Sequence, residues 1–143
     1  MKITRRNPLR AGYLFILLLA IQCSDQAPKN EIVVHRFPDG SPKEVWIYPE
    51  AKNSNLRTEI LYFENGRKQR QRQMNNDLPD GPWIEWHRNG QKKYEKNYHA
   101  GNLDGEQLGW FMSGEPLYKS TFEDGQQISR ITWDIHGNIV SRN

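Results

Sequence analysis

The chain has 143 residues, enough for one folded domain, and a formal net charge of +3 at pH 7. Four of its 20 basic residues precede Cys23, whereas all 17 acidic residues follow it, so residues 23–143 carry a net charge of −1. This near-neutral balance argues against nucleic acid as a partner. Cys23 is the single cysteine, which excludes an intrachain disulfide.

Residues 1–22 are typical of a signal peptide. A basic segment ends at Arg10, and an uncharged apolar run follows from Ala11 to Ile21. The 11 residues of this run suit the central region of a signal peptide. They fall short of the roughly 20 residues that a membrane-spanning helix needs. We therefore expect a signal-peptide helix and export, with an uncleaved signal anchor as the alternative.

Cys23 stands two residues after the apolar run. Residues 19–23, Leu-Ala-Ile-Gln-Cys, resemble a bacterial lipobox, although Gln22 replaces the usual small residue. A free thiol would be reactive after export, so we expect lipidation of Cys23; an incidental cysteine in a secreted protein is the alternative. Residues 23–30 then form the lipidated cysteine and a flexible tether. The expected location is the envelope of a Gram-negative bacterium, at the outer membrane or facing the periplasm.

Internal repeats are the strongest pattern in residues 31–143, the expected folded domain. Glycines recur at spacings of 26, 24, 24 and 23 residues, which indicates a repeat architecture. An aliphatic residue stands six positions before each glycine, and in the last four copies an aromatic residue stands four positions before it. These repeat-defining residues are Gly66, Gly90, Gly114 and Gly137, with Tyr62, Trp86, Trp110 and Trp133; the first copy has Gly40, with Val34 and Arg36 in the same columns.

The spacing inside each unit predicts a β-hairpin. Ile84 and Trp86 are two residues apart, which is the period of a strand. A three-residue loop ending in Gly90 would pair residue 87 with 91 and residue 84 with 94. This pairing places Ile84, Trp86 and Tyr94 on one apolar face and leaves the other face wet.

A second set of turns is expected where aspartate precedes glycine, at residues 80–81, 104–105 and 124–125. With the first set, these turns predict an all-β domain. Its fold is a single-layer antiparallel meander of about five hairpin units, each of about 24 residues. Neighbouring units must pair edge to edge, because an isolated hairpin is marginally stable in water.

Residues 98–114 resemble the MORN repeat variant of bacteria. They run aromatic, two residues, glycine, two residues, Asp-Gly, a strand with an aromatic residue, and a closing glycine. The resemblance covers about residues 59–137, with Asp77 in place of the earlier glycine of one copy. It implies a hairpin meander that acts through contacts with proteins or membrane surfaces, often in exported or lipidated chains. Some members carry an antitoxin label.

No catalytic constellation, metal site or cofactor site is predicted. The four histidines, His35, His87, His99 and His136, lack partners at zinc-like spacing. His87 and His99 lie outside the main apolar column and are expected to be exposed strand or turn residues. Glu85 and Glu95 could be cross-strand neighbours, as in a glycoside hydrolase. A flat meander implies no cleft for that chemistry.

The candidate binding face comprises Arg70, Arg72, Trp83 and Phe111. Along residues 67–73 arginine and glutamine alternate, so Arg70 and Arg72 are expected on one face of a strand and the glutamines on the other. Such a strand can contact anionic headgroups or an acidic partner. The alternative is a solvated strand kept soluble by its charge.

The sequence therefore predicts a non-enzymatic cell-envelope lipoprotein, a binding or scaffold module for an unidentified protein partner or a membrane surface. An antitoxin-like or immunity protein is the alternative, and an envelope hydrolase is the least favoured hypothesis. The oligomeric state is left open.

Overall fold

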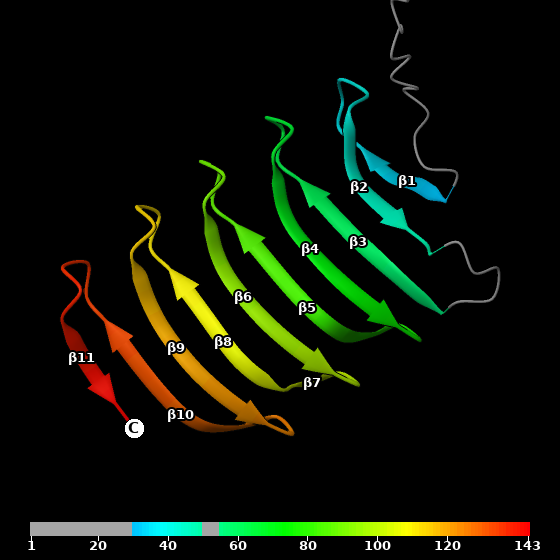
Figure 1. Cartoon of the computed structure of the whole chain (residues 1–143). Coiled ribbons are helices and arrows are strands. Elements are labelled where there is room, and N and C mark those ends of the chain that lie inside the picture. Colours follow the sequence, from blue (N-terminus) through cyan, green and yellow to red (C-terminus); the bar gives the residue numbers. More distant parts are fainter. Residues whose placement is uncertain (1–29, 50–54) are drawn as a thin grey trace, which may run out of the picture.

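The computed structural model describes residues 30–49 and 55–143. The predicted signal peptide, Cys23 and most of the tether lie outside these residues. The described part is all-β, without helix, and forms one open sheet of 11 strands (Figure 1). The strands are β1 (Glu31–Arg36), β2 (Pro42–Ile47), β3 (Leu56–Tyr62), β4 (Lys68–Asn75), β5 (Leu78–Trp86), β6 (Lys92–His99), β7 (Asn102–Leu103), β8 (Gly105–Trp110), β9 (Pro116–Glu123), β10 (Gln126–Trp133) and β11 (Ile139–Arg142).

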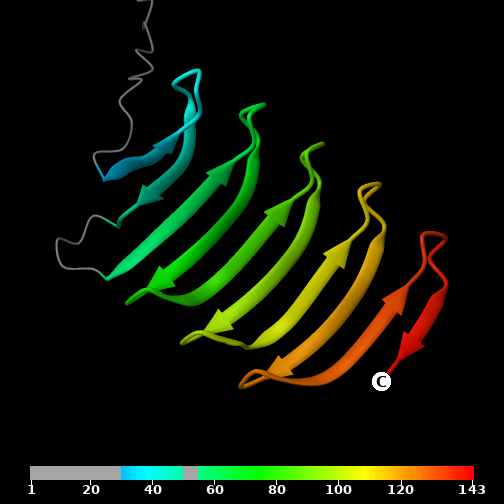
Figure 2. The ribbon, with the colours of Figure 1, turned by 180° about the vertical axis from the view of Figure 1, so that it is seen from behind.

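The sheet is an antiparallel meander in chain order. Each strand pairs with the next along the chain, except that the two-residue β7 pairs with β6 alongside β8. Figures 1 and 2, seen from opposite sides, show a single layer with β1 and β11 at its two free edges. The predicted all-β meander is confirmed. No helix of the described residues is long and apolar enough to cross a membrane.

Each glycine of the first set closes a three-residue loop. At Gly90 the backbone N–H of His87 donates to the carbonyl of Gln91 (2.8 Å), and the N–H of Gly90 donates back to His87 (2.9 Å). The φ of Gly90 is +93°, a conformation that a β-carbon disfavours. The predicted pairing of residues 87 and 91 is thus confirmed. The same two backbone bonds recur at Gly40, Gly66, Gly114 and Gly137.

The predicted pairing of residues 84 and 94 is wrong, because a β-bulge follows each loop. Trp86 pairs with Lys92, but Glu85 pairs with Tyr94, so Lys93 is an extra residue. One extra residue moves every following side chain to the other face of the sheet. Tyr94 therefore lies on the opposite face from Trp86. The next hairpin repeats the shift between Gly109 and Trp110.

Apolar residues consequently lie on both faces, and the prediction of a single apolar face is wrong. The register defines a column face, which carries the predicted repeat columns: Ile60, Ile84, Leu108 and Ile131, with Tyr62, Trp86, Trp110 and Trp133. It also defines a cation face, which carries Trp46, Met74, Trp83, Tyr94, Tyr98, Tyr118 and Phe122 among Arg57, Arg70, Arg72, Lys96 and Arg130. A single layer has no second sheet to cover it, so each face needs its own apolar side chains.

The first hairpin departs from the predicted columns. A bulge in β1 lies between Val33 and His35, and Val33 is the residue that pairs with Val45. Val33, rather than the predicted Val34, therefore occupies the aliphatic column. Within the described residues the buried apolar side chains are few: Val45, Ile60 and Met74 are at most 6% exposed. The core is thin and is concentrated over the first half of the sheet.

The turns at the other ends of the strands, opposite the glycine loops, are two-residue turns in the left-handed conformation. They fall at Asn76-Asp77, Ala100-Gly101 and Asp124-Gly125, where both residues have positive φ. Only residues 124–125 match the predicted set. Gly81 lies within β5 and Gly105 begins β8, each four residues after a turn. The other two Asp-Gly pairs are therefore not reversals: one lies inside a strand and the other leads into one.

Candidate functional site

Three of the four predicted binding residues meet on the cation face. The guanidinium carbons of Arg70 and Arg72 lie 5.4 and 5.0 Å from the ring centre of Trp83. Arg70 pairs with Leu61 and Gln71 with Ile60, so arginine and glutamine alternate between faces as predicted. Phe111 lies apart from this cluster, in the loop after β8, where its N–H donates to Glu115.

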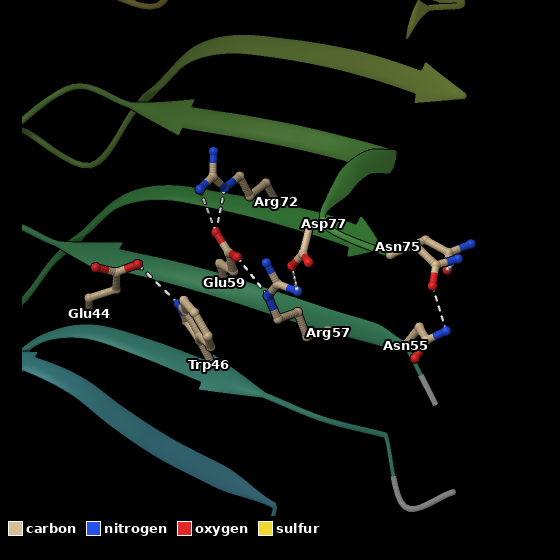
Figure 3. A network of polar contacts seen from close by, with 9 residues as sticks. Glu44, Trp46, Asn55, Arg57, Glu59, Arg72, Asn75 and Asp77 are labelled. Carbon is tan, nitrogen blue, oxygen red and sulfur yellow. Dashed lines mark hydrogen bonds and ion pairs between the residues drawn. The ribbon is translucent and has the colours of Figure 1, made fainter. Parts of the chain in front are cut away.

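A buried carboxylate anchors this cluster (Figure 3). Glu59 is 4% exposed, and its two oxygens accept hydrogen bonds from Arg57 Nε (2.7 Å) and Arg72 Nε (2.6 Å). Arg57 continues to Asp77 through its Nη1 (2.7 Å) and stacks on the ring of Trp46. The charge of Arg72 is therefore engaged by Glu59, and its main role is structural. The network joins β3, β4 and the turn that follows β4.

The pKa of Arg57 reflects this network. Burial would lower the pKa, but the hydrogen bonds to Asp77 and Glu59 outweigh it and hold the pKa above its ordinary value. A guanidinium is charged at any accessible pH in any case. The consequence is structural: the positive charge is fixed in place between two carboxylates.

Three other cations of the cation face have no carboxylate within ion-pair distance among the described residues: Arg70, Lys96 and Arg130. Each lies over an aromatic ring instead. Lys96 Nζ is 5.4 Å from the ring centre of Tyr94, and Arg130 Cζ is 4.2 Å from that of Tyr118. Such contacts hold a cation in place without neutralising it.

The aromatic rings connect these cations across strands. Tyr94 and Tyr118 are 6.2 Å apart between ring centres, and Trp83 and Tyr98 are 5.4 Å apart. Burial raises the pKa of Tyr118 above its ordinary value, so the phenol stays neutral beside Arg130 at neutral pH. The cation face thus carries two pairs of tilted rings with positive groups beside them, from β4 to β10.

The histidines lie at separate places. His35 contacts Glu44 (2.8 Å), His87 contacts the Trp110 carbonyl (3.1 Å), and His99 lies 3.5 Å from Asp80. His136 is in the last loop. Across residues 30–49 and 55–143 no three metal-binding side chains form a group.

The proposed neighbourhood of Glu85 and Glu95 is wrong. Glu85 pairs with Tyr94 on the cation face, whereas Glu95 pairs with Ile84 on the column face. The bulge at Lys93 separates the two carboxylates to opposite sides of the sheet. They cannot act on one substrate.

Sequence reasoning missed the side chains that connect adjacent loops. Asn89 accepts a hydrogen bond from the N–H of Gln91 (3.1 Å) and donates to the carbonyl of Met112 in the next loop (2.8 Å). Asn65 makes the same contact with Arg88 (3.3 Å). Their shared position one residue before the loop glycine was the available signal. It indicated a turn but not a bond between repeats.

The comparisons with known proteins give no relative. No family model matches the chain, and neither the curated proteins nor the solved structures that were searched gave a significant match.

Proposed function

We propose that the chain is a non-enzymatic binding and scaffold module of the cell envelope. The supporting observation is the cation face, where Arg70, Lys96 and Arg130 are held over aromatic rings and, among the described residues, have no carboxylate within 4 Å. The nearest acidic neighbour of Arg70 along the register is Glu85, which is its cross-strand partner. A cation that is already ordered loses less conformational entropy when it meets an acidic group. The partner that fits this face is an acidic protein surface, with the anionic headgroups of a membrane as the other source of the same charge.

The location is part of this proposal. Residues 1–22 are a signal peptide, Cys23 carries the lipid, and residues 24–30 are the tether that leads into β1. The likeness to the MORN repeat variant supports a role in contacts rather than chemistry. An anchored, single-layer sheet presents both faces to the periplasm at a short distance from the membrane.

Labelling of cells with radioactive palmitate tests the anchor. The wild-type protein is expected to take up label and to partition into detergent, because a diacylated cysteine is strongly apolar. Cys23→Ala is expected to lose the label. An unlabelled wild-type protein would contradict the anchor while leaving the cation face untested, so the two parts of the proposal fail separately.

A pull-down from solubilised envelope tests the cation face. Arg70→Gln with Lys96→Gln is expected to reduce recovery of the partner about tenfold, since two charge contacts are worth about 1–2 kcal/mol. Arg72 is left in place because Glu59 needs it. The matched control is Lys43→Gln with Lys119→Gln, two exposed lysines of the column face. Equal recovery from both double variants would refute the cation face as the binding surface.

A second candidate is an immunity-type protein that neutralises its partner by strand pairing. The observation that favours it is the free edge at β11, whose residues are all exposed, with Ile139 and Val140 at 51% and 60%. Unpaired edges of this kind readily add a strand. Loss of the partner in the same pull-down by Val140→Lys, rather than by the arginine and lysine changes, would favour this candidate.

A further inference from the structure

The column face carries one aromatic ring in each of the last four hairpins, in a row across the strands. Tyr62, Trp86, Trp110 and Trp133 each stand four residues before a loop glycine and lie on β3, β5, β8 and β10. One strand separates each from the next. Because adjacent strands are about 4.8 Å apart, the rings repeat about every 9.6 Å across the sheet. All four side chains are partly exposed.

Shallow hollows lie along this row. Trp110 and Trp133 line one of about 240 Å³, whose other walls include Leu108 and Lys119. A second, of about 280 Å³, lies on the other side of Trp110 and is lined by Gln91 and Lys92. A third, of about 160 Å³, lies beside Tyr62. Trp110 is therefore the shared wall between two adjacent hollows.

A row of aromatic rings at a fixed repeat fits a ligand that itself repeats. We propose that the column face binds a β-1,4-linked glycan chain that runs across the strands, with one disaccharide for each of the last four hairpins. The C–H face of a pyranose ring stacks on an aromatic ring, as other apolar groups with slightly positive hydrogens do. In a β-1,4 chain successive sugars are turned over, so the same face recurs at every second sugar, close to the spacing of the rings.

The polar groups of the row narrow the class of glycan. Lys68 Nζ lies 5.9 Å from the ring centre of Trp86, and Lys92 Nζ lies 5.9 Å from that of Trp110. The bonded partner of Lys68 is the neutral Gln71, at 2.8 Å. Lys92 also pairs with Glu95 Oε2, at 2.6 Å. An ammonium near the rings of Trp86 and Trp110 suits amide carbonyl and carboxylate substituents. The ligand is thus an N-acetylated glycan that bears carboxylates, which is the chemistry of a bacterial cell-wall strand.

The glycan proposal rests on the proposed function in one respect: the protein must be exported to meet a cell-wall glycan. The glycan would bind the column face, whereas the partner of the proposed function would bind the cation face on the opposite side of the sheet. A flat lipid surface would make no use of a fixed repeat or of hollows between rings. A glycan chain uses both.

Titration of the full-length protein in detergent with soluble chitin oligosaccharides of two, four, six and eight sugars tests the repeat. The affinity, measured by calorimetry, is expected to rise with each added disaccharide. Co-sedimentation with purified, insoluble cell-wall sacculi is expected for the wild type as well. No binding to either probe overturns the inference, and so does an affinity that is independent of oligosaccharide length.

Matched tryptophan variants locate the site. Trp110→Ala is expected to weaken oligosaccharide binding about tenfold, the loss of about 1.4 kcal/mol of stacking. Trp83→Ala removes the same side chain from the cation face and is expected to leave the affinity within about twofold. Equal losses in the two variants, with melting temperatures unchanged, overturn the assignment to the column face.

An exposed variant covers the case in which Trp110→Ala does not fold. Lys92→Gln changes one side chain of a hollow and is expected to weaken binding to sacculi, which carry carboxylates, more than binding to chitin oligosaccharides, which do not. An equal effect on both probes overturns the assignment of Lys92 to a carboxylate. Loss of glycan binding in every assay, alongside a pull-down that still depends on Arg70 and Lys96, would remove this inference and retain the proposed function.

Discussion

Replacing Glu59 with alanine is expected to lower the free energy of unfolding by about 3–5 kcal/mol. The side chains of Arg57 and Arg72 are only 13% and 23% exposed, and both donate to this one carboxylate. Without it, two guanidinium groups remain partly desolvated with a reduced set of acceptors. Urea denaturation followed by tryptophan fluorescence measures the change.

The matched control is Glu106→Ala. Glu106 also pairs with a cation, Lys119, but both side chains are about half exposed, at 58% and 45%. An exposed pair contributes about 0–1 kcal/mol. Similar losses for Glu59→Ala and Glu106→Ala would show that the network contributes no more than an ordinary surface pair.

Gly109→Ala is expected to destabilise the protein by about 1–3 kcal/mol, the usual effect of a group added where there is no space for it. A β-carbon at this position would lie 2.7 Å from Cδ1 and 3.0 Å from Cζ of Tyr118. The ring cannot move aside freely, because it stacks on Arg130 and neighbours Tyr94. Thermal unfolding by circular dichroism measures the loss, and near-ultraviolet spectra report the tyrosine environment.

Gly66→Ala provides the contrast. At Gly66 a β-carbon would meet no atom within 4 Å, but φ is +76°, so the expected cost is backbone strain of about 1 kcal/mol. The two glycines are thus required for different reasons, space at Gly109 and conformation at Gly66. A Gly109 variant as stable as the wild type would contradict the close packing of Tyr118.

The loops could be predicted from the sequence because a recurring glycine marks a position where the backbone φ is positive. A glycine such as Gly90 is needed where φ is positive. The regular recurrence of these loop glycines predicted the number of hairpins and the positions of their loops. The bulge could not be predicted in the same way. Lys93, the extra residue, is an ordinary strand residue, and nothing in its chemistry marks it. The assignment of side chains to faces depended on that one position.

Part of the candidate site could be predicted, because some of its residues stand out in the local sequence. Arg70 and Arg72 were singled out by charge and by alternation, which holds because no bulge interrupts the pairing of residues 70–75 with β3. Trp83 was singled out as an aromatic residue at a surface position. The burial of Glu59 was not predictable, because a glutamate in a strand ordinarily faces water. It becomes buried through cross-strand partners on β4 and the following turn, which only the long-range register brings together.

The chain-order meander has a consequence for how the molecule folds and grows. Every strand pairs with one that is a few residues away along the chain, so no long loop must close before pairing begins. Strand pairing can therefore start at any one hairpin and propagate to its neighbours. The two terminal strands are held from one side alone and are the first to fray. Insertion or deletion of a whole hairpin would leave the neighbouring registers intact, so the reach of such a sheet can change in steps of one unit without redesign of the rest.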